Sequence, residues 1–276
     1  MTLQEVLKAG ERKLKKHKVP EAGLNAWYLF AASFGLTKSQ FFLRAEETAE
    51  ESRYSQYLQW LGKRCQRVPL EYITGETEFM GLPFVVNEHV LIPRQDTECL
   101  AEEALRYAAG ADVLDLCTGS GCLGISLAKL GQCKSVTLSD FSAEALSVAA
   151  ENAERNSVSV ETVKSDLFQT LKGDFDLIVS NPPYIPRAEI PSLMPEVSKY
   201  EPVCALDGSE DGLLFYRRIT RDASSFLREG GRLLFEIGAD QGEAVMRLMR
   251  DVGFSEVEVL QDLAGLDRIV SGQYKK

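Results

Sequence analysis

Apolar residues in the first 70 positions recur at the spacing of amphipathic helices. The first stripe is Trp27, Phe30, Ala31 and Phe34, and the second is Tyr54, Tyr57, Leu58, Leu61 and Cys65. Aromatic residues at this spacing form a core between helices far more often than they bind ligands. Residues 1–70 are therefore predicted to fold as a small helical bundle.

The pattern changes in residues 71–90. The segment YITGETEFMGLPFVV has β-favouring residues around Gly75 and Gly81. This arrangement is typical of a short hairpin, and it predicts a linker between the helical bundle and the rest of the chain.

Helix-like and strand-like segments alternate from residue 91 onward. Strands are predicted near 112–116, 135–139, 159–163, 175–180, 232–237, 256–261 and 267–272, and helices near 97–109, 121–130, 142–156, 212–228 and 240–252. Such alternation predicts a parallel sheet with helices on both faces. The last two strands have only a short connection, so they should pair antiparallel.

The prediction for residues 91–276 is thus an α/β domain with a Rossmann-like, seven-stranded sheet. Asp96 or Thr97 should cap its first helix, since both residue types are good N-caps. The stretch 183–211 has few periodic signals and several prolines. A loop of that length in a compact domain is usually functional or mobile.

Charge is distributed unevenly along this chain of net charge −10. Residues 1–84 have 12 Lys+Arg and 10 Asp+Glu, whereas residues 85–276 have 19 and 31. The acidic larger part should repel a nucleic-acid backbone, so no direct nucleic-acid partner is expected. The basic run is Lys8, Arg12, Lys13, Lys15, Lys16 and Lys18. It could contact an acidic partner, although such runs are more often solvated helix faces.

Other features of the composition exclude several classes of protein. The six cysteines match no zinc spacing and only two histidines are present, so we expect reduced thiols and no metal. No apolar run approaches the roughly 20 residues of a membrane span. The N-terminal segment lacks the apolar region of a signal peptide, which favours a cytoplasmic protein with no membrane partner.

A glycine-rich turn follows the first predicted strand of the sheet, in VLDLCTGSGCLG (113–124). Gly119, Gly121 and Gly124 satisfy G-x-G-x-x-G, which alone would suggest a dinucleotide site. Asp115 lies four residues before Gly119, and a carboxylate there should repel a pyrophosphate. A cationic ligand would be favoured, and S-adenosylmethionine is cationic and has no phosphate.

The next two strands also end in acidic residues. Asp140 follows the second strand, 21 residues after Gly119, where a carboxylate can accept hydrogen bonds from both ribose hydroxyls. Alternatively, Asp140 or Ser142 caps the following helix. After the third strand, Asp166 could accept from an adenine amino group and Phe168 could cover the ring; the alternatives are a turn residue and a core aromatic.

The tetrapeptide Asn181-Pro182-Pro183-Tyr184 directly follows the apolar strand 175–180. Ligands of open α/β sheets bind at the carboxyl ends of the strands. Asn181 offers an amide, Pro182 a carbonyl on a backbone with fixed φ, and Tyr184 a ring that can stack on a flat group. The motif therefore suits a planar nitrogen group, although a Pro-Pro loop after a strand remains the alternative.

Together these motifs resemble class I S-adenosylmethionine-dependent methyltransferases that act on amino groups. Four longer segments narrow the resemblance to the peptide chain release factor glutamine methyltransferases, the PrmC/HemK family. They are PLEYITGETEFMGLPF (69–84), LIPRQDTE (91–98), SNPPYIP (180–186) and YEPVCALDGSEDGL (200–213). The resemblance extends over essentially the whole chain.

This resemblance implies methyl transfer from S-adenosylmethionine to the side-chain amide nitrogen of the Gly-Gly-Gln glutamine of class I release factors, with S-adenosylhomocysteine as product. Such a reaction modulates translation termination. Asn181 and the Pro182 carbonyl would hold the amide, with Pro183 and Tyr184 beside it. Residues 1–70 would recognise the protein substrate, and the enzyme would be a monomer. The implied cofactor residues are Arg94, Thr97, Asp115, Cys117, Thr118, Gly119, Ser120, Gly121, Asp140, Asp166, Phe168 and Asn181.

The chain departs from the family pattern at two positions. Cys117 stands where glycine is frequent, and Gln95 stands where proline is common. Arg94 could instead pair with a surface carboxylate. Glu236 is a candidate for structure rather than chemistry, and no general base is assigned.

Rival functions remain at this stage. A glutamine methyltransferase of a ribosomal protein would share most motifs, but the ALDGSEDGL segment argues against it. A nucleic-acid methyltransferase acting on adenine N6 would need a basic groove or a base-flipping pocket. A dehydrogenase and a non-catalytic cofactor-binding protein fit the motifs less well.

Overall fold

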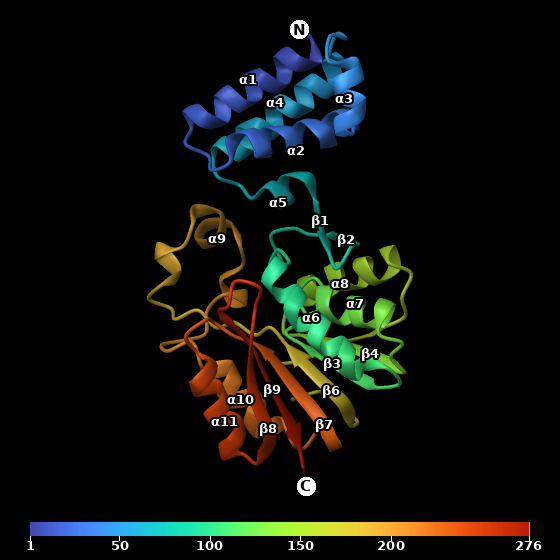
Figure 1. The fold of residues 1–276 in the computed structure, drawn as a ribbon, viewed down its shortest axis with the longest axis vertical. Coiled ribbons are helices and arrows are strands. Elements are labelled where there is room, and N and C mark those ends of the chain that lie inside the picture. The colour runs from blue at the N-terminus through green and yellow to red at the C-terminus, as the bar shows by residue number, and fades with distance from the viewer. Residues whose placement is uncertain (276) are drawn as a thin grey trace. The chain divides into compact units, whose positions relative to one another are not determined.

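The computed structural model describes residues 1–275 and contains two compact units (Figure 1). The first unit comprises Met1–Gly75 together with Met194–Tyr200, and the second comprises Glu76–Leu193 and the chain from Glu201 onward. The observed boundary therefore follows Gly75, and the hairpin belongs to the second unit. The short segment 194–200 joins the first unit although its neighbours on both sides belong to the second.

The first unit is helical. Its helices are α1 (Leu3–Lys16), α2 (Ala22–Phe34), α3 (Lys38–Arg44), α4 (Glu51–Cys65), α5 (Leu70–Thr74) and α9 (Pro195–Tyr200). Thr2 and Thr37 each begin a helix with a reciprocal capping box, which satisfies backbone N–H groups that have no partner within the helix. Sequence signals near the helix ends therefore set where α1 and α3 begin.

The core of this unit is built on the two predicted aromatic stripes. Phe30 and Tyr57 are fully buried with their rings edge to face, and the Tyr57 hydroxyl donates to the Ala26 carbonyl at 3.2 Å. A buried hydroxyl with a partner avoids the cost of an unmade hydrogen bond. Leu58 is 40% exposed, so its assignment to the core was wrong: α4 turns this position toward solvent.

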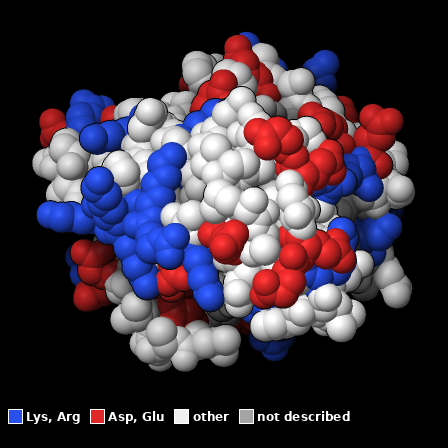
Figure 2. All heavy atoms as spheres, turned by 90° about the horizontal axis from the view of Figure 1, so that it is seen from above, with Lys and Arg blue, Asp and Glu red and all other residues white. Residues whose placement is uncertain are grey.

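The basic run lies on α1 and the loop after it. Its side chains are exposed or half-buried, and three of them lie in the last turn of α1. Cations at this end complement the partial negative charge of the helix carbonyls. Lys15 also pairs with Glu11 one turn earlier, at 2.5 Å. Figure 2 shows that Lys and Arg side chains gather in patches on the face drawn there.

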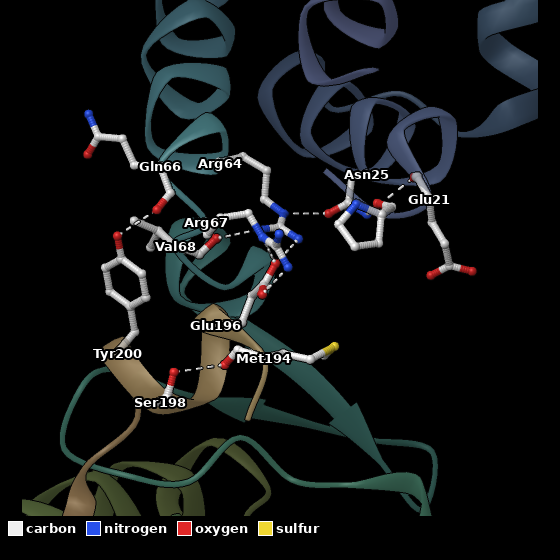
Figure 3. Close-up of polar contacts among 11 residues, drawn as sticks. Glu21, Asn25, Arg64, Gln66, Arg67, Val68, Met194, Glu196, Ser198 and Tyr200 are labelled. Carbon is white, nitrogen blue, oxygen red and sulfur yellow. Dashed lines mark hydrogen bonds and ion pairs between the residues drawn. The ribbon is translucent and has the colours of Figure 1, made fainter. Parts of the chain in front are cut away.

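An ion-pair cluster holds α9 within the first unit (Figure 3). Glu196 accepts hydrogen bonds from Arg64 Nη2 at 2.7 Å and from Arg67 Nε and Nη2 at 2.6 Å each. Tyr200 donates to the Gln66 carbonyl at 2.7 Å. Although burial opposes ionisation, the hydrogen bonds from Arg67 and Arg64 lower the pKa of Glu196 to about 2. The cluster therefore stays charged across the physiological range.

The second unit contains a seven-stranded sheet in the order β5-β4-β3-β6-β7-β9-β8. The strands are β3 (Asp112–Leu116), β4 (Ser135–Asp140), β5 (Glu161–Lys164), β6 (Phe175–Ser180), β7 (Leu227–Glu236), β8 (Phe254–Gln261) and β9 (Asp267–Tyr274). Of these seven described strands, only β9 runs against the others. The α/β sheet and its antiparallel last pair are confirmed.

Helices cover both faces of the sheet (Figure 1). One face packs against α6 (Gln95–Ala108), α7 (Cys122–Leu130) and α8 (Ala143–Arg155). The other packs against α10 (Leu214–Ala223) and α11 (Gly242–Asp251). Every residue of β3 is buried, as a strand between two helical layers requires.

The predicted hairpin is β1 (Glu76–Phe79) paired with β2 (Leu82–Val85). The Asn152 side chain on α8 accepts from the Val85 N–H at 2.6 Å and donates to its carbonyl at 3.0 Å. Asn156, one turn later, donates to the Pro83 carbonyl at 2.9 Å. Two asparagines thus attach the hairpin to the sheet domain.

Two details of the sequence-based prediction need correction. The N-cap of α6 is Arg94, without a side-chain cap, so capping by Asp96 or Thr97 was wrong. The Thr97 hydroxyl oxygen instead accepts a hydrogen bond from Asn181 Nδ2. The helix predicted at 212–228 ends at Ala223, because β7 begins at Leu227.

The stretch 183–211 is more ordered than its sequence suggested. It contains two short 3₁₀ turns, Ile190–Ser192 and Val203–Ala205, on either side of α9. Ile185 forms an isolated parallel bridge with Asp207. The two ends of the stretch are therefore joined to each other.

Candidate active site

A cavity of about 460 Å³ opens within the second unit. Residues at or just after the carboxyl ends of β3, β4, β5 and β6 line it, including Gly119, Asp140, Asp166 and Asn181. The chain order of the strands reverses between β3 and β6, and ligands of open α/β sheets bind at such a point. The fold therefore brings together motifs spread over more than sixty residues.

The glycine turn needs unusual backbone conformations. Cys117, Gly119 and Gly121 have φ values of 59°, 55° and 81°. A Cβ on Gly121 would lie 2.7 Å from the Ile125 side chain, so only glycine fits without a shift. Cys117 adopts a conformation that favours glycine, which gives a physical reason why glycine is frequent at this position of the family pattern.

Asp115 lies beneath this turn and does not line the cavity. Its Oδ2 accepts from the Thr118 hydroxyl at 2.6 Å and from the Gly124 N–H at 2.9 Å. Burial raises the pKa of Asp115 to about 7. Asp115 was expected among the cofactor residues, but the structure places it outside the cavity lining, where it holds the turn.

Asp140 is the carboxylate that reaches the cavity at this turn. Its Oδ2 accepts from the Gly119 N–H and its Oδ1 from the Ser142 N–H, both at 2.9 Å. Ser142 is the N-cap of α8 and accepts from the Ala145 N–H, so the capping role belongs to it. Each Asp140 oxygen keeps a lone pair for a ligand. Burial raises the pKa of Asp140, partly offset by these backbone donors.

Asp166 also lines the cavity and is held by a cation. Both of its oxygens accept from Arg218 Nη2, at 2.8 and 2.9 Å. Phe168 is buried in the core instead, where it stacks on Phe226 with ring centroids 4.7 Å apart. The structure thus places Phe168 away from the cavity wall.

The cavity also contains an aromatic residue that sequence reasoning missed. Phe141 lines the cavity and is 69% exposed, directly after Asp140. An exposed aromatic side chain next to a site carboxylate is available to stack on a ligand ring. Its position at the carboxyl end of β4 was the signal that could have revealed it.

The Asn-Pro-Pro-Tyr motif divides between the cavity and the core. Asn181 and Pro183 line the cavity, whereas Pro182 and Tyr184 are outside its lining. Asn181 Nδ2 donates to Thr97 Oγ1 at 3.3 Å. The Tyr184 hydroxyl donates to Glu236 Oε1, also at 3.3 Å.

The segment ALDGSEDGL packs against this motif. The Ile185 N–H donates to the Leu206 carbonyl at 3.0 Å, and the Gly208 N–H donates to the Ile185 carbonyl at 2.9 Å. A Cβ on Gly208 would lie 2.8 Å from the Tyr184 Cα. Glycine is therefore needed here for close approach of two backbones, and the segment supports the loop that carries Asn181.

Arg94 and Thr97 both line the cavity, from the start of α6. Arg94 Nη2 lies 2.5 Å from Glu201 Oε2. Glu201 is only 4% exposed, so the partner of Arg94 is a buried carboxylate and not a surface one. Sequence reasoning did not single out Glu201.

Two other features are absent from the described residues, a cluster of metal ligands and a membrane-spanning helix. In residues 1–275, no group of three or more His, Cys, Asp and Glu residues could hold a metal ion. None of the helices in the same range has an apolar run long enough to cross a membrane.

The sheet order, the glycine turn and the Asn-Pro-Pro-Tyr loop define a methyltransferase of Rossmann-like fold. The family model for the methyltransferase small domain matches residues 95–193, and that for the PrmC N-terminal domain matches residues 5–75. A solved methyltransferase from Pyrococcus furiosus has the same fold, with a TM-score of 0.56 and 17% identity; the match covers 82% of this chain and all of that one.

The chain belongs to the release factor glutamine methyltransferase family. It is 42% identical to the release factor glutamine methyltransferase of Geobacter sulfurreducens over 275 residues, 99% of this chain and 96% of the relative. It is also 42% identical to the Clostridium acetobutylicum protein of that name over 248 residues, 86% of this chain and 87% of the relative. The resemblance noted in the sequence is thereby confirmed.

Proposed function

We propose that this protein transfers a methyl group from S-adenosylmethionine to the side-chain amide nitrogen of the Gly-Gly-Gln glutamine in class I release factors. The single observation that carries the proposal is the position of Asn181 in the cavity wall, with its Nδ2 bound to Thr97. Its Oδ1 is then available to accept from a substrate amide. The full-length similarity to release factor glutamine methyltransferases supports this substrate.

The residues of the cavity fit S-adenosylmethionine. A volume of about 460 Å³ lies within the usual range of small-molecule sites. Asp140 would accept from the ribose hydroxyls, and the positive-φ turn at Gly119 and Gly121 lets the backbone approach the ligand closely. Phe141 and Asp166 would hold the adenine end. When bound, the cofactor supplies the methyl group on a sulfonium.

Amide nitrogen is a poor nucleophile because its lone pair is delocalised into the carbonyl. The same resonance gives a rotation barrier of about 18–20 kcal/mol in a peptide bond. Correct alignment of the reacting atoms can contribute about 7–11 kcal/mol. Asn181 and Pro182 would supply that alignment by accepting the two amide hydrogens, on the side-chain oxygen and the backbone carbonyl. The Pro182 ring is buried, but its carbonyl belongs to the peptide bond with Pro183, which lines the cavity.

These two acceptors would also favour the transition state over the ground state. As the nitrogen lone pair turns toward the methyl group, the N–H groups become more acidic and their hydrogen bonds strengthen. The proton would leave the nitrogen after methyl transfer, when it is strongly acidic. Tyr184 would pack behind the glutamine, and Pro183 would close the cavity wall beside it.

The remaining expectations concern the partner and the state of the enzyme. We expect the helical unit to recognise the release factor and the enzyme to act as a monomer in the cytoplasm. The basic side chains of α1 are suited to an acidic protein surface.

Mass spectrometry of a class I release factor incubated with the protein and S-adenosylmethionine tests the proposal. One added methyl on the Gly-Gly-Gln glutamine is expected with the native sequence and not with Asn181→Ala. A release factor in which that glutamine is replaced by alanine is the matched substrate control. No methyl with intact cofactor binding would refute the proposal and leave a ribosomal protein or adenine N6 as the substrate to examine.

A further inference from the structure

A buried carboxyl group lies behind the Asn-Pro-Pro-Tyr loop and outside the cavity lining. Glu236, the last residue of β7, is 2% exposed. Its Oε1 accepts from the Tyr184 hydroxyl at 3.3 Å, and its Oε2 has no hydrogen-bond partner of its own. A buried carboxyl with an unused acceptor is costly, and such groups cluster at functional sites.

Thr97 connects this carboxyl group to the cavity. Its side chain is in the interior, 2% exposed, and its hydroxyl is close enough to Glu236 to lower the pKa of that carboxyl group, against the larger raising effect of burial. The same oxygen accepts from Asn181 Nδ2 at 3.3 Å. A threonine hydroxyl has a single hydrogen, so it can donate to only one of these two neighbours at a time.

This restriction links the protonation of Glu236 to the direction of the Asn181 amide. An ionised carboxylate only accepts. Because Thr97 accepts from Asn181, its own hydrogen is free to turn toward the unpartnered Oε2 of Glu236. Asn181 then presents its nitrogen to Thr97 and its oxygen to the cavity. A protonated Glu236 can donate to Thr97, whose own hydrogen is then free for the Asn181 oxygen, and the amide would turn over.

We infer that Glu236 is a positioning residue, which acts through Thr97 to hold the Asn181 oxygen toward the substrate amide. The inference rests on the proposed role of Asn181 as acceptor. Glu236 contacts neither cofactor nor substrate in this arrangement. It determines which group donates and which accepts in the hydrogen bonds from Glu236 through Thr97 to Asn181.

The surroundings of Glu236 allow both protonation states. Burial raises the pKa of Glu236 to about 7, against the effects of Thr97, Arg268 and Tyr184. Arg268 on β9 forms ion pairs with Asp262 at 3.1 Å and with Asp96 on α6 at 3.2 Å. Its positive charge is therefore divided between these carboxylates and does not fully compensate the charge of Glu236. Asp96 also acts on Glu236 directly and raises its pKa by repulsion. Tyr216 on α10 and Cys122 on α7 interact with Glu236 as well.

The direction of the pH effect follows from these assignments. Above a pH of about 7 Glu236 is ionised and the Asn181 oxygen faces the cavity. Below this pH the protonated carboxyl group no longer accepts from Thr97. The Asn181 side chain then turns its NH2 group toward the cavity, in place of the oxygen that should accept from the substrate amide. Turnover at saturating substrates should therefore fall with falling pH, by about tenfold or more, as expected for the loss of a strong hydrogen bond.

The experiment measures kcat for the release factor at saturating S-adenosylmethionine on both sides of that pH, with three variants. Glu236→Gln cannot titrate and should remove the pH step. Thr97→Val removes the hydroxyl and should lower kcat above that pH and abolish the pH step, whereas Thr97→Ser keeps the hydroxyl and should show the pH step of the native enzyme. Thermal melting of each variant reports whether it is folded, and the Val and Ser pair tests the inference even if Glu236→Gln is unstable.

The outcomes separate this inference from the proposed function. If the native enzyme adds no methyl to the glutamine, the proposed function fails. If it methylates the glutamine but shows no pH step, or if Thr97→Val turns over like the native enzyme, the positioning role alone is refuted. A pH step that persists in Glu236→Gln would assign the titration to another group and refute it as well.

Discussion

The carboxylate of Glu196 lies 2.7 Å from the guanidinium of Arg64, although 132 positions separate the two residues in the chain. This contact, together with Arg67, attaches a short helix from the loop after the Asn-Pro-Pro-Tyr motif to the helical unit (Figure 3). The chain therefore passes between the two units both after Gly75 and on each side of this helix.

Replacement of Glu196 by alanine should destabilise the helical unit. Arg64 is 5% exposed and would lose the partner of its buried charge, which typically costs about 3–5 kcal/mol. Urea unfolding followed by circular dichroism measures the change. Glu46→Ala, at a solvent-exposed position of the same unit, is the control and should have little effect. Equal stability of the two variants would contradict the prediction.

The same carboxylate should make stability depend on pH in the acid range. The folded-state pKa of Glu196 is lowered to about 2, below its usual 4.5, so its contribution is fully present above the usual value. It should be lost as the pH falls from about 4.5 toward 2. Comparison of the unfolding free energy of the native protein and Glu196→Gln across this range isolates the effect. A difference that stays constant with pH would show that the pKa of Glu196 is the same in the folded and unfolded states, against the prediction.

Asp140→Ala should weaken cofactor binding by about 10–100-fold, as expected for loss of hydrogen bonds to a charged acceptor. Turnover at saturating cofactor should change much less. Isothermal titration with S-adenosylmethionine measures the affinity. Asp140→Asn retains one acceptor oxygen for Gly119 and should bind with intermediate affinity. Unchanged binding in Asp140→Ala would exclude the proposed ribose contact.

Asn181→Ala should have the opposite effect to Asp140→Ala. Removal of a preorganised group that acts on the transition state typically costs about 10²–10³ in kcat. The affinity for S-adenosylmethionine should stay close to that of the native protein. Single-turnover methylation of a release factor measures the chemical step. A large loss of cofactor affinity with normal turnover at saturation would reject the assigned role.

Asp115→Ala should loosen the glycine turn. Without the carboxylate, the Thr118 hydroxyl and the Gly124 N–H lose their acceptor in a buried region, at a cost of about 1–3 kcal/mol each. Asp115→Asn keeps one acceptor and removes a buried charge, so it should lose less stability. Thermal melting distinguishes them, and a variant Asp115→Ala as stable as the native protein would argue against the holding role.

Several features of the fold could be predicted because they depend on local patterns. The buried strands β3 and β6 follow from continuous apolar runs, and the antiparallel pair β8–β9 follows from a connection too short for a crossover. The cluster of motifs at the carboxyl strand ends follows from the parallel sheet itself. The capping boxes at Thr2 and Thr37 each depend on a partner only three positions along the chain.

Other features depend on contacts between distant residues. Whether Asp140 or Ser142 caps α8 was open in the sequence, and the structure assigns the cap to Ser142. Phe168 follows the same strand end as Asp166, yet one lies in the core and the other in the cavity wall. Their partners differ, because Phe168 stacks on Phe226 in the core and Asp166 binds Arg218.

The sequence by itself determined the class of fold, the family and the positions of the site motifs, because periodicity, turn chemistry and motif spacing are local properties of the chain. The tertiary structure decided the tasks of single side chains. Asp115 supports the turn, Glu236 accepts from Tyr184 in the interior, and Glu196 attaches α9 to the helical unit. These assignments depend on burial and on partners distant in sequence, which only the packed chain brings together.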